Sequence, residues 1–438
     1  MAFFSVAVAL ALAGGEAPLT LEQALDLAQR RNPELLAGRE RAAGQAARAE
    51  SVRRSSWPRI SLSSGWSRTD NPSMVFAGRL NAGELAEADL AIDRLNDPGG
   101  ISHLTTAAAL EVPLDVFGKI GAQTEAQRAA ARMAEAELAE ASLLLRQHVV
   151  EAYRRAALAG RATEVTAHAL AGARAREADV AARVAEGAAL QAELLRARVR
   201  RRLREADLAE RRAESSIALA GLARLIGAES GTAYLPSEAA PAPDVLAGDE
   251  ASWSERALRA RPLLAAARER LEAERWAARG ERRSLLPDLS AFGQLQDDRN
   301  SLSGGARSTS FGAFVRWTAF DASRGKRRAA AEAAVRAAEH ELRAANDQVR
   351  LEVASAWRRA LAARERYAAA AGGAEEGREA LRVVQERRRA GIATLTDELE
   401  TEAGSLAAEL EEIRAAAEAA IGDAALERAT GGTGRERQ

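Results

Sequence analysis

Two segments of the chain, residues 119–186 and 324–390, each run for more than 60 residues without a proline, and their length limits how the chain can fold. Both are rich in Ala, Glu, Leu and Arg, which is the composition of long helices. The first segment has 68 residues. At 1.5 Å per residue such a helix is about 100 Å long. No globular core covers a helix of this length, so we expect the long helices to pack side by side through Ala-rich faces.

Each long segment ends at a glycine, Gly187 or Gly391, and a shorter helical segment follows. Glycine reaches the left-handed conformation that ends a helix and lets the chain reverse. We therefore predict two long helical hairpins, at residues 119–226 and 324–428, that turn at these glycines.

Proline and glycine positions indicate an internal duplication. Pro33 falls opposite Pro262, and Pro58 opposite Pro287, both at an offset of 229 residues. The two hairpin glycines are 204 residues apart, because the first copy carries 25 extra residues. A register kept over such distances is typical of a repeat.

The expected plan of each repeat is a helix, a β-hairpin and a long helical hairpin. The first helices, residues 21–56 and 253–284, are expected to stop before a proline, since the residue before proline disfavours α geometry. The full division is a signal peptide at 1–13, repeat 1 at 17–236 with a β-hairpin at about 58–117, a linker at 237–250, repeat 2 at 251–430 with a β-hairpin at about 287–320, and a disordered tail at 431–438.

The segments between the helices alternate apolar residues with polar or small ones. In FGAFVRWTAF, for example, Phe311, Val315 and Trp317 fall on one face and Gly312 and Thr318 on the other. Strands of about ten residues with this pattern suit the wall of a membrane barrel or a soluble, half-buried hairpin. Residues 71–100 lie between the first two strands and form either an exposed loop or a partial lid.

Composition excludes several classes of protein. The net charge of −1, with 29% charged residues, leaves no footprint for nucleic acid, and the absence of cysteine excludes disulfides and thiolate metal sites. The apolar start, with an A-x-A pattern at residues 11–13, is typical of a signal peptide, although a charged n-region is missing. No later segment has the 18 apolar residues of a membrane helix, so any membrane contact must use a β-barrel.

The ordered set of four strands, two helical hairpins, a duplication and a signal-like start resembles the TolC-type outer membrane efflux protein family, the outer membrane factors. The resemblance rests on LTLEQALDLAQRRNPEL (residues 19–35), VPLDVFGK (112–119), RWTAFDASRGK (316–326) and the two glycine turns. It implies a mainly α fold with a membrane β-barrel, built from a duplicated repeat of long α-helical hairpins plus β-hairpins. A trimer would form a twelve-stranded β-barrel and a twelve-helix periplasmic α-barrel. Open sheet edges are not tolerated in lipid, so a single chain could not span the membrane alone.

The resemblance also implies a function and its partners. The trimer would lie in the outer membrane, in contact with its lipid, and extend into the periplasm. It would conduct passively what an inner-membrane efflux pump exports through a periplasmic adaptor (membrane fusion) protein. No cofactor, metal or nucleic acid is implied. The alternatives are an outer membrane duct for type I protein secretion or a cytoplasmic coiled-coil scaffold.

The family pattern places two kinds of site at the hairpin tips. The adaptor-docking residues would be Gly187, Leu190, Gly391 and Leu395, and the pore constriction would be lined by Glu193, Asp397 and Glu400. Some relatives hold the tip closed with an arginine two residues after the second glycine, where this chain has Ala393. Arg388 or Arg389 is a candidate substitute.

An enzymatic function is not supported by the sequence. The histidines His103, His148, His168 and His340 are dispersed, and none has the spacing of a metal site or a catalytic triad. The glycine-rich stretch at residues 301–308 lacks the lysine and the helix of a phosphate loop.

Overall fold

The computed structural model describes residues 17–228, 234–300 and 305–432. The predicted signal peptide and residues 433–438 of the predicted tail lie outside this part of the chain. Two compact units form. Unit 1 takes the described residues of Met1–Ala42, Ala134–Ala266 and Leu342–Gln438, and unit 2 takes those of Ala43–Met133 and Ala267–Glu341.

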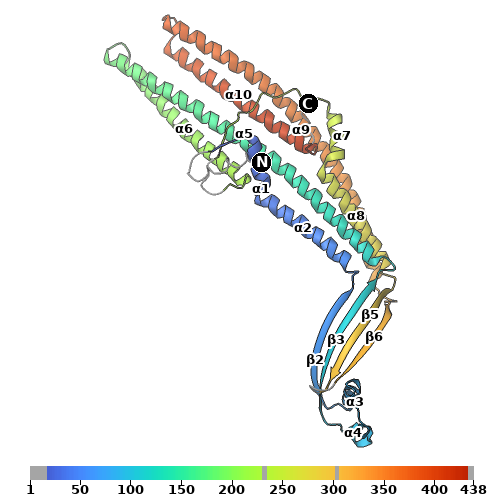
Figure 1. Cartoon of the computed structure of the whole chain (residues 1–438). Coiled ribbons are helices and arrows are strands. Elements are labelled where there is room, and N and C mark those ends of the chain that lie inside the picture. Colours follow the sequence, from blue (N-terminus) through green and yellow to red (C-terminus); the bar gives the residue numbers. More distant parts are fainter. Residues whose placement is uncertain (1–16, 229–233, 301–304, 433–438) are drawn as a thin grey trace, which may run out of the picture. The chain divides into compact units, whose positions relative to one another are not determined.

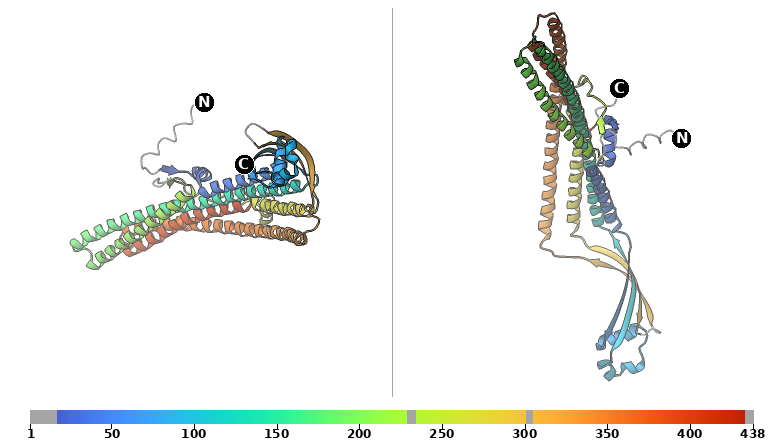
Figure 2. Two further views of the ribbon diagram at one scale, coloured as in Figure 1. Left: turned by 90° about the horizontal axis from the view of Figure 1, so that it is seen from below. Right: turned by 90° about the vertical axis from the view of Figure 1, so that its left-hand side faces the viewer.

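Two helical hairpins dominate unit 1. The first consists of α5 (Lys119–Ala185) and α6 (Gln191–Leu225), and the second of α9 (Arg324–Arg389) and α10 (Leu395–Ala429). The partners of each hairpin lie side by side in both orientations (Figures 1 and 2). The N-terminal parts of α5 and α9 belong to unit 2. None of the helices in the described ranges is both long and apolar enough to cross a membrane.

The first helix of each repeat is broken, which corrects the prediction of single helices at 21–56 and 253–284. The structure has α1 (Leu21–Arg31) with α2 (Pro33–Arg54), and α7 (Glu250–Ala260) with α8 (Pro262–Arg283). The residue at each break is extended, with ψ near 120°. Proline offers no N–H to the preceding turn and disfavours α geometry in the residue before it, so the helix is interrupted there.

The two repeats bury equivalent cores in unit 1. In each core, side chains from the broken helix pack against side chains of the long helix. The first core includes Ala28, Leu35, Leu145 and Val149, and the second includes Ala257, Leu264, Val349 and Val353. These pairs lie at the offsets of 229 and 204 residues found in the sequence, so the duplication extends to the packing.

A short parallel pairing that the sequence did not predict joins β1 (Ala17–Leu19) to β4 (Tyr234–Pro236). The hydroxyl of Tyr153 on α5 donates to Leu19 O at 2.8 Å. The predicted linker at 237–250 begins directly after β4, and Arg154 donates to its Ala239 O at 2.8 Å. These contacts hold the segment that connects repeat 1 to repeat 2 against α5.

Unit 2 contains a four-stranded antiparallel sheet in the order β2-β3-β5-β6 (Figure 1). The strands are β2 (Arg59–Thr69), β3 (Ile101–Leu114), β5 (Asp288–Arg299) and β6 (Ala306–Arg316). The two repeats meet where β3 pairs with β5. The parts of α2, α5, α8 and α9 that belong to unit 2 adjoin one end of the sheet, and residues 70–100, between β2 and β3, lie at the other.

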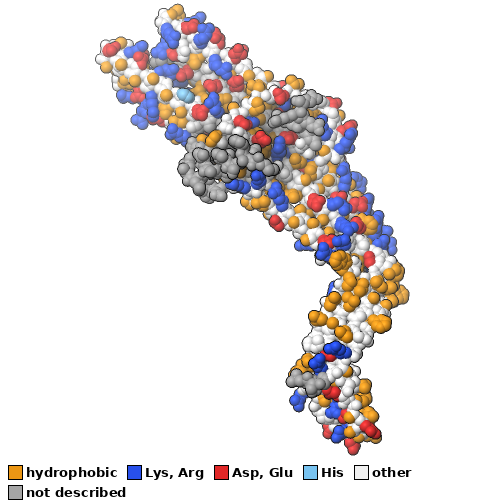
Figure 3. All heavy atoms as spheres, in the orientation of Figure 1, with side chains coloured by type: hydrophobic (Ala, Val, Ile, Leu, Met, Phe, Trp, Pro, Cys, Tyr) orange, Lys and Arg blue, Asp and Glu red, His pale blue; other side chains and the backbone are white. Residues whose placement is uncertain are grey.

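The two faces of this sheet differ in chemistry. The apolar face carries exposed large hydrophobic side chains, including Ile60, Leu62, Trp66, Leu104, Leu110, Leu295, Phe311 and Val315; apolar side chains are dense over the strands in Figure 3. By register, the polar face carries Ser61, Ser63, His103, Thr105, Gln294, Gln296, Asp298, Ser308 and Ser310. Phe311 is 90% exposed within one chain, which makes the apolar face a surface that requires a cover.

Candidate functional site at the helical tips

Both hairpins turn through the same backbone motif. Gly187 has φ 73° and Gly391 has φ 75°. In each turn the glycine N–H donates to the carbonyl three residues back, and the next N–H donates to the carbonyl five residues before it, at 2.7–3.1 Å. This is the hydrogen-bond pattern of a Schellman turn, which satisfies the last carbonyls of the helix. The turns therefore need a residue that tolerates the left-handed conformation.

Apolar side chains are exposed beside both glycines. Leu190 precedes α6 and is 69% exposed, and Ile392 follows Gly391 and is 76% exposed. A free glycine surface next to an exposed aliphatic side chain offers a partner both backbone and apolar contact. Leu395 is the first residue of α10. Sequence reasoning missed Ile392, although it directly follows the turn glycine.

The two hairpins begin their second helices differently. Leu190, the N-cap of α6, makes no side-chain hydrogen bond to the helix. Thr394, the N-cap of α10, accepts from Asp397 N at 3.2 Å, and Asp397 Oδ2 accepts from Thr394 N at 2.8 Å. This reciprocal pair is a capping box, which satisfies backbone donors at the helix start.

The capping box gives Asp397 a structural role that the sequence reasoning overlooked. The Thr394 hydroxyl, together with the Thr394 backbone N–H, holds the pKa of the Asp397 carboxyl below its usual value of 3.8. The T-x-x-D pattern at residues 394–397 could have revealed it. Asp397 is thus both an exposed carboxylate near the tip and the cap of α10.

Two of the three predicted pore acids line one groove of unit 1. This groove, about 960 Å³ in volume, lies between the two hairpins and is lined by residues of all four helices. Its lining includes Glu193 and Glu400 but not Asp397. It also carries Arg176, Arg196 and Arg200. The acids therefore face a mixed-charge groove in the isolated chain.

A network of ion pairs ties the two hairpins together near the tips. Glu398 on α10 is only 7% exposed. It pairs with Arg388 on α9 and with Arg176 on α5, and Arg176 also pairs with Glu402 on α10. The link from Arg176 to α10 joins hairpin one to hairpin two. From sequence, Arg388 or Arg389 was a candidate for holding the tip closed; in the structure Arg388 pairs with Glu398 within hairpin two. The burial of Glu398 depends on packing that the sequence does not display.

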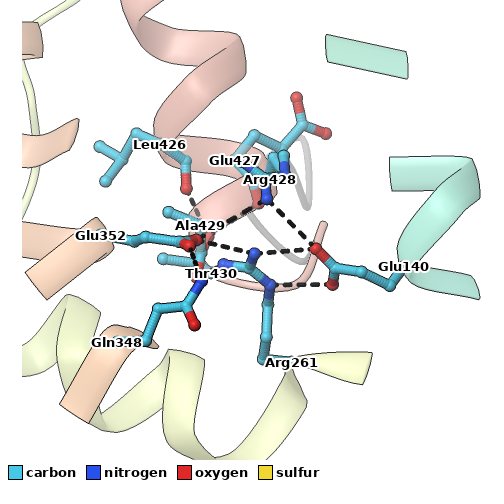
Figure 4. A network of polar contacts seen from close by, with 9 residues as sticks. All are labelled: Glu140, Arg261, Gln348, Glu352, Leu426, Glu427, Arg428, Ala429 and Thr430. Carbon is cyan, nitrogen blue, oxygen red and sulfur yellow. Dashed lines mark hydrogen bonds and ion pairs between the residues drawn. The ribbon is translucent and has the colours of Figure 1, made fainter. Parts of the chain in front are cut away.

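A second network holds the base of hairpin two (Figure 4). The fully buried Arg261 side chain lies at the junction of α7 and α8. Its guanidinium contacts both carboxylate oxygens of Glu140 on α5, at 2.9 and 2.8 Å, and Glu352 on α9 at 2.9 Å. Arg428 on α10 lies 3.4 Å from Glu140. These paired charges connect the junction of α7 and α8 with α5, α9 and α10.

The residues that the structure describes contain no cluster of His, Cys, Asp or Glu that could hold a metal ion. The tips carry turn glycines and exposed apolar side chains, and the two networks consist of ion pairs. Such features support contact with partners and solutes.

Solved structures share this fold. A membrane protein from Pseudomonas aeruginosa matches with a TM-score of 0.77 and 22% identity, over 94% of this chain and 93% of that one. The Campylobacter jejuni CmeC outer membrane channel matches with a TM-score of 0.80 and 18% identity, over 95% and 87%. The open state of the Neisseria gonorrhoeae MtrE outer membrane channel matches with a TM-score of 0.73 and 20% identity, over 95% and 90%. The architecture is thus that of outer membrane channels.

The family follows from a second comparison. A family model described as outer membrane efflux protein matches residues 24–228 and 253–432, and the chain belongs to this family. The resemblance inferred from the sequence and the predicted fold class are confirmed. The first residues of the two matched segments are 229 apart and their last residues 204 apart, which are the offsets of the duplication. A comparison with curated proteins finds no match.

Proposed function

We propose that three copies of this chain form an exit duct through the outer membrane, which passively conducts substrates delivered by an inner-membrane efflux pump. The observation that carries the proposal is the four-stranded sheet. It combines an exposed apolar face, a polar face and two open edges. Open edges are not tolerated in lipid, and a sheet closed into a barrel removes them.

The geometry of the edges supports closure between copies. The edge strands β2 and β6 each have 11 residues. Strand direction alternates along the sheet, so β6 of one copy runs antiparallel to β2 of the next. At about 3.4 Å per residue and a tilt of about 45°, such strands span about 26 Å, which matches the apolar band of an outer membrane barrel. The apolar face would then contact lipid and the polar face would line the duct.

The hairpin tips are proposed as the docking site of a periplasmic adaptor. The docking residues would be Gly187 and Gly391 in the turns, Leu190 at the start of α6 and Leu395 at the start of α10. The exposed side chains of Leu190 and Ile392 beside the glycines support a contact there. The ion pairs of Glu398 would hold the hairpins together in the resting state. Glu193, Asp397 and Glu400 would form rings of carboxylates around the pore axis, because threefold symmetry repeats each residue around that axis.

The assembly is tested by extracting the protein from outer membranes. We expect release only by detergent, a trimeric mass by light scattering, and ion conductance in a planar bilayer. A monomer released by salt, or a protein without conductance, would contradict the duct.

Docking is tested separately by Gly187→Pro and Gly391→Asp in cells with a matching pump and adaptor. Proline cannot adopt positive φ, and aspartate adds a side chain to an open turn. We expect lost efflux and lost adaptor cross-linking with the trimer intact. As a control, Gly44→Ala changes a glycine within α2 whose Cβ would meet nothing within 4 Å. Normal efflux in both turn variants would place the docking site elsewhere.

A further inference from the structure

Residues 71–100, hereafter the insertion, fold into a small compact element. It contains α3 (Pro72–Asn81), the 3-10 helix η1 (Glu87–Leu90) and α4 (Ile92–Asn96). Asn71 caps α3 by accepting from Ser73 N at 3.1 Å. Arg79 on α3 pairs with Asp89 on η1, and Val75 is buried. The insertion therefore has its own internal contacts.

The insertion is seated on the polar face of the sheet. Helix α3 contacts both β3 and β5. A Cβ added to Gly78 would come within 2.8 Å of Ile101 Cδ1 and 3.5 Å of His103 Nδ1. Asn300, directly after β5, donates from Nδ2 to Gly78 O at 3.2 Å. A side chain at position 78 would require Ile101 or α3 to shift.

Polar side chains fix the strand positions beneath α3. His103 on β3 lies 2.7 Å from Asn300 Oδ1 and 3.0 Å from Asp298 Oδ1. Asp298 is 2% exposed and accepts hydrogen bonds from Thr105 and Gln296 at 2.8 and 2.7 Å. A buried carboxylate with several donors is held in one geometry. The seat of the insertion is therefore ordered by contacts that lie on the polar face.

We infer that the insertions of the three copies meet over the outer mouth of the duct and narrow it. The inference rests on the proposed closure of the sheet. In a closed barrel the polar face is the inside, and the end of the sheet away from the long helices is the outer end. An element fixed to the polar face at that end extends over the opening, where its neighbours are the other two copies.

Exposed apolar side chains supply the contact between copies. The insertion exposes Met74, Leu80, Leu90 and Ile92 in the single chain. Large apolar side chains gathered on a small element that faces water are unusual unless another surface covers them. A second copy of the insertion, related by the threefold axis, is the surface within reach. The resulting opening would pass small ions and restrict large hydrophilic solutes.

Disulfide cross-linking tests the contact between copies. The chain has no cysteine, so Ile92→Cys introduces the only thiol. We expect oxidation of the purified trimer to link chains covalently. Val245→Cys is the control. This residue of unit 1 is 94% exposed, so the variant measures the disulfides that form by random collision between chains. No more cross-linking at position 92 than at position 245 would overturn the inference.

A loop exchange tests the restriction itself. Repeat 2 joins its strands through a short loop, so residues 70–100 are replaced by the sequence of residues 300–305, NSLSGG. We expect higher single-channel conductance and entry of larger polyethylene glycols in a polymer-exclusion assay. Gly78→Val, which removes the close approach but keeps the insertion, is expected to shift both readouts in the same direction.

The two proposals fail in different ways. A wild-type protein that forms no conducting trimer contradicts the proposed function. A conducting trimer whose polymer cut-off is unchanged by the loop exchange leaves the duct standing and shows that the insertion points away from the opening.

Discussion

Asn32 and Arg261 occupy equivalent positions in the two repeats, and each donates a side-chain hydrogen bond to the last helical carbonyl of its own repeat. Asn32 Nδ2 lies 3.0 Å from Leu225 O, and Arg261 Nη1 lies 3.0 Å from Ala429 O. The amide of Asn32 and the guanidinium of Arg261 therefore make the same contact, which joins the break in the first helix of a repeat to the end of its last helix. This contact is called the joint of the repeat. Only the guanidinium of Arg261 also donates to two carboxylates, those of Glu140 and Glu352. Because Glu140 lies on α5, the second repeat has an additional contact with the first.

Arg261→Asn, which gives repeat 2 the residue of repeat 1, tests this extra tie. The change removes the buried guanidinium from Glu140 and Glu352 and leaves them only the more distant Arg428, at 3.4 and 3.8 Å; breaking a buried ion pair typically costs about 3–5 kcal/mol. We expect a loss of this size in the free energy of unfolding, measured with denaturant. Adding Glu140→Gln should recover part of it. Arg259→Asn, at an exposed pair with Glu255, should change stability by less than about 0.5 kcal/mol.

Gly391 and Gly431 share a left-handed backbone but differ in the space around them. A Cβ on Gly391 would meet nothing within 4 Å, whereas one on Gly431 would lie 2.8 Å from Ala260 O. Gly391→Ala therefore adds only backbone strain, about 1–2 kcal/mol. Gly431→Ala adds a clash with the backbone and should lower the free energy of unfolding by clearly more. Equal losses of unfolding free energy in the two variants would show that the backbone at Ala260 shifts easily to accept the added methyl group.

Glu398→Gln tests the ion pairs of Glu398. The change removes the charge that pairs with Arg388 within hairpin two and with Arg176 of hairpin one, and should weaken the contact between the hairpins by about 3 kcal/mol. We expect a higher open probability of single channels in a planar bilayer. The exposed pair Glu379–Arg382 supplies the control, because Glu379→Gln should leave gating unchanged. Identical gating in both variants would argue against a lock at Glu398.

Asp397→Asn with Glu400→Gln tests the pore acids while keeping an oxygen that can accept the capping bond. Carboxylate rings attract cations, and salt screens the effect. We expect lower cation selectivity in the double variant, measured by reversal potentials in a salt gradient. Unchanged selectivity would place the acids on an outer surface.

The pH dependence of this selectivity follows from the cap. The folded-state pKa of Asp397 lies below its usual 3.8, so the carboxylate and its capping contribution are present above that value. Both are lost only as the pH falls through the lower, folded-state pKa. Selectivity due to Asp397 should thus persist at pH 4, where an unperturbed glutamate is partly protonated. A loss beginning near pH 5 would mean that another group dominates.

Much of the fold could be predicted because it is encoded locally. Long proline-free runs, alternating strands and the two turn glycines carry their structure in their own residues. The interruption at Asn32 was missed although the same proline rule was applied at Pro58, because a helical pattern continued beyond it. The pairing of β1 with β4 involves three residues per strand, too few for a periodic signal. The burial of Glu398 arises from packing between distant segments and has no local signature.

The equivalent joints of the two repeats also bear on ancestry. Each repeat carries two of the four strands of the main sheet and one long helical hairpin. A half-length ancestor would have needed six copies to present the strands that three present chains contribute. Fusion of two such copies freed the second joint from matching the first. The difference between the amide of Asn32 and the guanidinium of Arg261 marks the divergence of the two repeats.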